Sequence, residues 1–123
     1  MNVVVWVPYG IYCLLDPASL EAAAGLAATS ATGTTELRAM YGGLQAAVGV
    51  LALCGLVGGA AMCRVALIAL CALPAGLAVG RLVGVLMDGD PTGYTLGALG
   101  FELVLAISAA LLLRQEAYGA LVS

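Results

Sequence analysis

The sequence predicts an all-α integral membrane protein, an up-down four-helix bundle with a short interfacial helix after the first span. The first observation behind this prediction is composition, since 63% of the 123 residues are hydrophobic and only 9% are charged. The mean hydropathy is +1.12, and a soluble domain of this size needs a far more polar surface. The other two observations are four apolar runs and the short links between them, which force antiparallel neighbours.

The four apolar runs define one transmembrane domain, residues 1–123, with spans at about 2–15, 36–57, 64–87 and 94–114. With a rise of ~1.5 Å per residue, each of the last three runs covers about 30 Å, enough to cross a bilayer core. The first run covers only ~20 Å and contains Pro8, so we expect a thin or tilted span completed by the apolar part of "PASLEAAAGLA". A secretory signal peptide is disfavoured because no Lys or Arg precedes this run.

The links contain recognisable helix-start and turn signals. Asp16 as N-cap and Pro17 at the first helical position predict a short helix that lies at the outer membrane interface or re-enters it. Thr34 or Thr35 can cap the second span, after the Gly-, Ser- and Thr-rich loop "ATSATGTT". "VGGAAMCR" and "MDGDPTG" are tight turns on either side of the third span.

Glycines recur at helical spacing on the last two spans, a pattern that permits close helix packing in lipid. The stripes predict packing faces and also allow a homo-oligomer or a larger membrane complex; they consist of Gly76, Gly80 and Gly84, and of Gly93, Gly97 and Gly100.

Composition excludes several kinds of site. With no His and no Lys, helical zinc motifs, a Ser-His-Asp triad, His-ligated haem, a P-loop and Schiff-base chemistry are excluded. The four cysteines form no CxxC pair, so we predict no disulfide, no metal site and no cofactor. The scarcity of basic residues argues against a nucleic-acid partner and leaves membrane lipid as the expected surrounding.

Orientation follows the basic residues. Arg64 in the second link and Arg114 after the last span lie on the same side as the N-terminus in a four-span layout. The positive-inside rule then predicts that both termini are cytoplasmic, although Arg38 and Arg81 weigh weakly the other way.

A carboxylate in the apolar run "YTLGALGFELVLAISAALLL" is costly, and this run contains Glu102. Arg81 lies ~10 Å below the outer boundary of the third span, and Glu102 lies ~12 Å below the same boundary in the fourth. We therefore expect Arg81 to pair with Glu102, and these two are the candidate catalytic residues. The alternative is a buried clamp that fixes helix register and performs no chemistry.

Further polar residues are expected at the same outer end. Arg38, Tyr41 and Gln45 are separated by three and four residues and would share one helical face. The candidate ligand-binding residues are Glu36, Arg38, Tyr41, Gln45 and Asp88.

Three segments together resemble a known family: "ELRAMYGGLQAAVGV", "LAVGRLVGVLMDG" and "LGFELVLAI". They are similar to the small bacterial four-span membrane proteins catalogued as domain of unknown function 4345. The resemblance rests on Glu36 to Gly43, on Gly80 and Arg81, and on Glu102, and Asp16 and Pro17 resemble the end of the family's first span. It implies the same architecture and polar cluster and implies no activity. The expected location is a bacterial inner membrane.

Three function classes remain open, and whether the chain is an enzyme is open with them. The first is an intramembrane Arg/Glu site that binds a lipophilic small molecule. Glu102 could convert this molecule by acid-base chemistry of the isomerase, epoxide-opening or cyclase type. The second is an accessory or structural subunit of a larger membrane complex. The third is a small proton-coupled transporter with Glu102 as the proton site.

Overall fold

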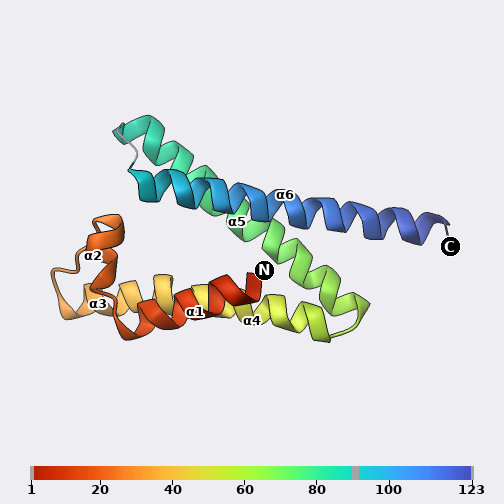
Figure 1. Ribbon diagram of the computed structural model, residues 1–123, viewed down its shortest axis with the longest axis horizontal. Helices are drawn as coiled ribbons and strands as arrows, with labels where there is room; N and C mark the ends of the chain where they lie inside the picture. The colour runs from red at the N-terminus through yellow and green to blue at the C-terminus, as the bar shows by residue number, and fades with distance from the viewer. Residues whose placement is uncertain (1, 90–91, 123) are drawn as a thin grey trace. The chain divides into compact units, whose positions relative to one another are not determined.

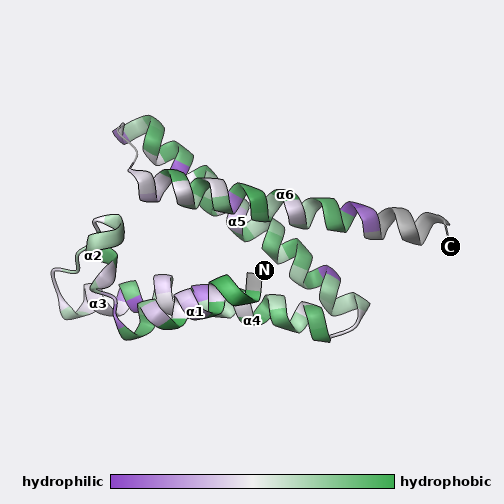
Figure 2. Ribbon diagram, viewed as in Figure 1, coloured by the Kyte–Doolittle hydropathy of each residue, from purple (hydrophilic) through white to green (hydrophobic). Residues whose placement is uncertain are grey.

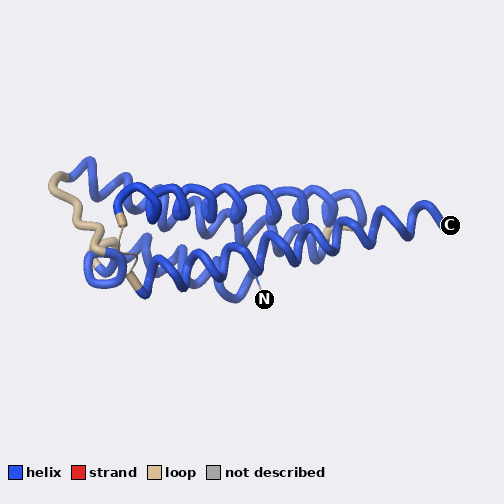
Figure 3. Tube along the Cα trace, turned by 90° about the horizontal axis from the view of Figure 1, so that it is seen from above, coloured by secondary structure: helices blue, strands red, loops and turns tan. Residues whose placement is uncertain are grey.

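The computed structural model describes residues 2–89 and 92–122, and the side chains of residues 3–89 and 92–115. This part of the chain is helical with short links and contains no strand (Figure 1; Figure 3). The segments in order are α1 (Asn2–Leu15), α2 (Ser19–Ala24), α3 (Ala31–Leu37), the π-helix η1 (Arg38–Gly43), α4 (Leu44–Val57), α5 (Ala60–Asp88) and α6 (Gly93–Val122). They fall into two units, Met1–Leu53 and Cys54–Ser123.

In the described part of the chain, three helices are long and apolar enough to cross a membrane, so the chain is an integral membrane protein. They are Ala31–Val57, in which α3, η1 and α4 form one continuous helix, then Ala60–Asp88 and Gly93–Gln115. Each contains the corresponding predicted span and starts before it (Figure 2). The first apolar helix, Val3–Leu15, is shorter, as the 2–15 run predicted.

In the first unit, α1 packs antiparallel against η1 and α4. A Cβ atom added at Gly49 would lie 2.8 Å from the backbone nitrogen of Val7, and one at Gly42 would lie 2.9 Å from that of Leu14. Between them, a Cβ at Gly10 would lie 2.7 Å from the carbonyl oxygen of Gly42. Real Cβ atoms do not come this close, so glycine at these positions lets the two backbones touch.

The link after α1 differs from the predicted helix start at Asp16 and Pro17. The chain makes a turn there: the backbone N–H and the hydroxyl of Ser19 both donate to the Asp16 carbonyl, and α2 begins only at Ser19. The helix is six residues long because Gly25 takes a left-handed conformation, with φ 70°, that ends it. The Gly25 N–H then donates to the Glu21 carbonyl, which is the bond of an αL cap, and the Leu26 N–H donates to the Leu20 carbonyl.

The cap of the second long helix also differs from the prediction. Ser30 is the N-cap, and its hydroxyl accepts a hydrogen bond from the Gly33 N–H at 3.0 Å. Thr34 and Thr35 lie inside the helix, where their hydroxyls donate to the carbonyls of Ser30 and Ala31. Ser30 comes first among several residues able to cap, so the helix starts one turn earlier than Thr34 would allow.

In the second unit, α5 and α6 pack against each other as an antiparallel hairpin. The predicted glycine stripes do not make this contact, because a Cβ at Gly76, Gly80 or Gly97 would meet no described atom within 4 Å. Each helix instead buries a stripe at three- and four-residue spacing; the stripes are Ala66, Leu70, Pro74 and Ala78 in α5, and Glu102, Leu105, Ala106 and Ala109 in α6. Small side chains in both stripes permit close packing without glycine.

Candidate functional site

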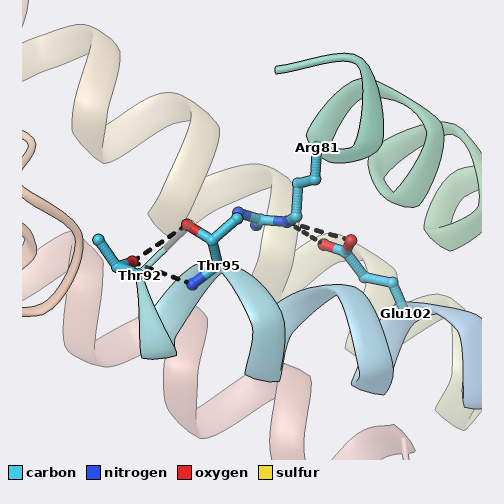
Figure 4. Close-up of polar contacts among 4 residues, drawn as sticks. All are labelled: Arg81, Thr92, Thr95 and Glu102. Carbon is cyan, nitrogen blue, oxygen red and sulfur yellow. Dashed lines mark hydrogen bonds and ion pairs between the residues drawn. The ribbon is translucent and has the colours of Figure 1, made fainter. Parts of the chain in front are cut away.

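The centre of the candidate site is an ion pair between α5 and α6. The Nε–H of Arg81 donates to both carboxylate oxygens of Glu102, with N–O distances of 2.9 and 3.1 Å (Figure 4). The side chain of Glu102 is 3% exposed and that of Arg81 is 24% exposed. The pairing predicted from helix rise is therefore confirmed, and the guanidinium is its more accessible member.

Residue spacing along α5 and α6 determines where these two side chains point. Glu102 belongs to the buried stripe of α6, three residues before Leu105, so it points inward with that stripe. Arg81 follows the buried Ala78 by three residues on α5 and stands near the edge of the buried face, which leaves its guanidinium partly exposed. The link between Asp88 and Gly93 is short, so the two helix ends are level and the side chains meet.

Two features beside the pair were not assigned to the site from sequence. The guanidinium carbon of Arg81 lies 5.7 Å from the centre of the Tyr94 ring, a cation–π contact. Tyr94 precedes Glu102 by eight residues, about two turns, and this spacing is the signal that was available. Tyr94 is not among the site residues predicted from the sequence.

The second feature is a pair of threonine hydroxyls at the start of α6. The Thr92 hydroxyl accepts from the Thr95 N–H at 3.3 Å and lies 3.1 Å from the Thr95 hydroxyl. Figure 4 shows the guanidinium reaching from Glu102 toward Thr95. The Tyr94 ring thus lies beside the pair, and the Thr92 and Thr95 hydroxyls contact each other at the start of α6.

The predicted residues of the second span all lie in the first unit. Arg38 is exposed, and its Nε–H donates to the Leu14 carbonyl at 3.0 Å, which caps the end of α1. Gln45 is buried, Tyr41 is half-buried and Glu36 is exposed. That these four join Arg81 and Glu102 in one site stays a prediction from the sequence.

The shared face predicted for Arg38, Tyr41 and Gln45 assumed a regular α-helix, and this assumption is wrong. Residues Arg38–Gly43 form a π-helix, which holds more residues per turn than an α-helix. The spacing of three and four therefore does not keep these side chains in one straight row.

Asp88 is exposed at the last residue of α5, two turns after Arg81. Its carboxylate is outside the ion pair, and its role as a ligand contact stays a prediction. Among the described side chains, no three His, Cys, Asp or Glu residues gather in a way that could hold a metal ion.

The pair combines a fixed positive charge with a carboxylate that can take up and return a proton. Arg81 keeps its charge under all ordinary conditions and can stabilise a negative oxygen beside it. Glu102 is the one described carboxylate that is buried, where water competes least for its hydrogen bonds.

Comparison with known proteins gives one result about the family and none about activity. A family model with the description "Domain of unknown function (DUF4345)" matches residues 1–113. No curated protein and no solved structure matches the chain.

Proposed function

The chain belongs to the DUF4345 family, whose description assigns no activity, and we propose that Arg81 and Glu102 form an intramembrane site for a lipophilic small molecule. The observation that carries the proposal is the pair itself, a buried carboxylate and a partly exposed guanidinium on two helices of membrane-spanning length. Charged residues at such depth are costly, and they mark substrate and ion pathways more often than they mark plain packing.

The unequal exposure of the two side chains favours binding over a closed clamp. A pair that only fixed helix register would be stable with both members buried, whereas 24% of the Arg81 side chain remains accessible. A ligand can reach the guanidinium while Glu102 holds it in place. Tyr94, whose ring centre lies 5.7 Å from the guanidinium carbon, adds an apolar and aromatic surface suited to such a ligand.

The chemistry open to this site is proton transfer. Glu102 would take a proton from the ligand, or return one, while Arg81 stabilises the negative charge that develops on a ligand oxygen. Double-bond isomerisation, epoxide opening and proton-initiated cyclisation all fit these two groups without a further cofactor.

The test is mass spectrometry of lipids and small molecules extracted from gently purified protein. Wild type is compared with Glu102→Gln, which keeps the side-chain shape and removes the charge, and with Asp16→Asn, an exposed control. We expect a distinct lipophilic compound in wild type and Asp16→Asn that is lost in Glu102→Gln. Bulk lipid alone in all three samples would contradict the proposal and favour the clamp.

A second candidate, an accessory subunit of a larger membrane complex, is favoured by the open glycines. At Gly76, Gly80, Gly97 and Gly100 an added Cβ would meet nothing within 4 Å among the described atoms, so another helix could approach there. Co-purification of a second membrane protein at fixed stoichiometry supports this candidate. Its loss on Gly76→Leu, with no loss of folding, would locate the contact.

We also propose a bacterial inner-membrane location with both termini in the cytoplasm, as the positions of Arg64 and Arg114 indicate. Fusions of a periplasm-active phosphatase and of a cytoplasm-active fluorescent protein to each terminus test this orientation. Fluorescence without phosphatase activity at both ends is expected, and phosphatase activity at either end contradicts it.

A further inference from the structure

A cavity lies in the first unit, beside the short helix α2. Its volume is about 150 Å³, and it is lined by Pro17, Ala18, Glu21, Leu26, Ala27, Ala28, Thr34 and Leu37. The lining comes from the turn before α2, from α2 itself, from the loop that follows it and from the first two turns of the long helix Ala31–Val57 (Figure 1). None of these residues belongs to the candidate site described above.

The shape of the cavity follows from the short helix α2. The left-handed Gly25 turns the chain, and the bond from the Leu26 N–H to the Leu20 carbonyl holds Leu26 back over α2. The loop then returns to Ser30, which caps α3. Both ends of the loop are thus fixed by backbone hydrogen bonds, so the cavity between them is preformed.

The polar side chains of the lining offer oxygen acceptors. Glu21 supplies an exposed carboxylate, and no cationic side chain in the described part of the chain pairs with it. Thr34 already donates its hydroxyl hydrogen to the Ser30 carbonyl at 3.2 Å, so its oxygen is left as an acceptor. No Arg lines the cavity. A ligand that satisfies these groups must donate hydrogen bonds and carry positive charge.

The remaining six lining residues are apolar, and the volume limits what they can enclose. A cavity of about 150 Å³ with apolar walls holds one benzene-sized group. We propose that this cavity binds an organic ammonium ion whose apolar part is the size of a benzene ring or a butyl chain. The ammonium group lies at Glu21 and Thr34, and the apolar part lies against Leu26, Leu37 and Pro17.

The test uses three probes of equal size that differ in charge: 4-fluorobenzylammonium, 4-fluorobenzyl alcohol and 4-fluorobenzoate. Binding to the full chain in a neutral detergent is followed by the fluorine NMR shift. Wild type should bind the ammonium saturably, the alcohol at least about tenfold more weakly, and the benzoate not measurably. The tenfold step corresponds to one charge-assisted hydrogen bond.

Glu21→Gln removes the charge at an exposed position, so the chain should still fold, and it should bring the ammonium down to the affinity of the alcohol. Ala28→Leu fills the cavity and should weaken both probes. Asp16→Asn removes a nearby exposed carboxylate that does not line the cavity and should change nothing. No saturable binding to wild type, or equal binding by Glu21→Gln, overturns the proposal.

An ammonium of this kind can be a free amine or the head group of a lipid, and a further arm separates the two. The ammonium titration is repeated after addition of phosphatidylethanolamine, and after addition of phosphatidylglycerol as a lipid without an ammonium group. Competition by the first lipid alone identifies a head group as the occupant. Unchanged binding with both identifies a free amine, and each result supports the same ligand chemistry.

Discussion

Arg81 holds both carboxylate oxygens of Glu102 through its single Nε–H, at 2.9 and 3.1 Å, between the two helices of one hairpin. Glu102 is the more deeply buried partner, with 3% of its side chain exposed against 24% for Arg81. Loss of Arg81 should therefore destabilise the protein more than loss of Glu102, because a buried charge without a partner costs more free energy than a partly exposed one.

The first prediction concerns this inequality. Arg81→Leu leaves the Glu102 carboxylate buried and alone, so we expect it to lower the free energy of unfolding by about 3 kcal/mol or more. Glu102→Leu leaves Arg81, which can turn its long side chain toward water, and should cost less. The double variant should recover much of the loss, and thermal unfolding in detergent measures all three. Additive losses would show that the two residues are not coupled.

The second prediction concerns the contact between α1 and the π-helix. Gly10→Ala brings a Cβ against the Gly42 carbonyl oxygen, only 2.7 Å away, so the two helices must separate. We expect a loss of about 1 to 3 kcal/mol in unfolding free energy. Gly97→Ala is the matched control, because a Cβ there meets nothing within 4 Å and helix propensity alone should make it neutral or slightly stabilising. Equal effects at Gly10 and Gly97 would contradict this packing.

The third prediction concerns Arg38. Arg38→Gln removes the donor to the Leu14 carbonyl and should cost about 1 kcal/mol, because the bond is exposed and water can replace it in part. Arg64→Gln removes an equally charged, exposed arginine and should cost nothing measurable. Hydrogen exchange in the last turn of α1 should rise in the first variant only. If exchange there is unchanged, Arg38 does not cap α1.

The fourth prediction concerns the start of the second long helix. Ser30→Ala removes the side-chain acceptor for the Gly33 N–H, which should cost about 1 kcal/mol and speed exchange of that amide about fivefold. Thr29→Ala, one residue earlier and exposed, is the control. An unchanged Gly33 exchange rate in Ser30→Ala would place the cap elsewhere.

The sequence predicted the three long apolar helices and the central pair for definite reasons. Runs of apolar residues report membrane helices directly, and the short link between Asp88 and Gly93 ties the registers of α5 and α6 together. Helix rise then carries Arg81 and Glu102 to the same level. Every step in that inference uses a quantity that sequence separation determines.

Other features of the structure could not be predicted from sequence separation. Arg38 donates to a backbone carbonyl. Every residue has such a carbonyl, so the sequence does not indicate which one is the acceptor. The π-helix at Arg38–Gly43 depends on hydrogen bonds that residue spacing does not report. Gly10, Gly42 and Gly49 carry the close approach in the first unit, while the more regular stripe through Gly76 and Gly80 carries none among the described atoms. A stripe of glycines permits the close approach of another helix. Whether a helix packs there depends on which segments of the fold lie next to the stripe.

The length of α1 has a consequence for the lipid around it. Its 14 residues extend about 21 Å, some 9 Å less than a typical hydrocarbon core. Hydrophobic mismatch of this size is relieved by local thinning of the bilayer, at fractions of a kcal/mol for each ångström. If α1 crosses the bilayer, as the sequence predicts, the lipid beside it is compressed, and the protein is better accommodated by short-chain lipids. A higher unfolding temperature in thin than in thick bilayers is the corresponding observable.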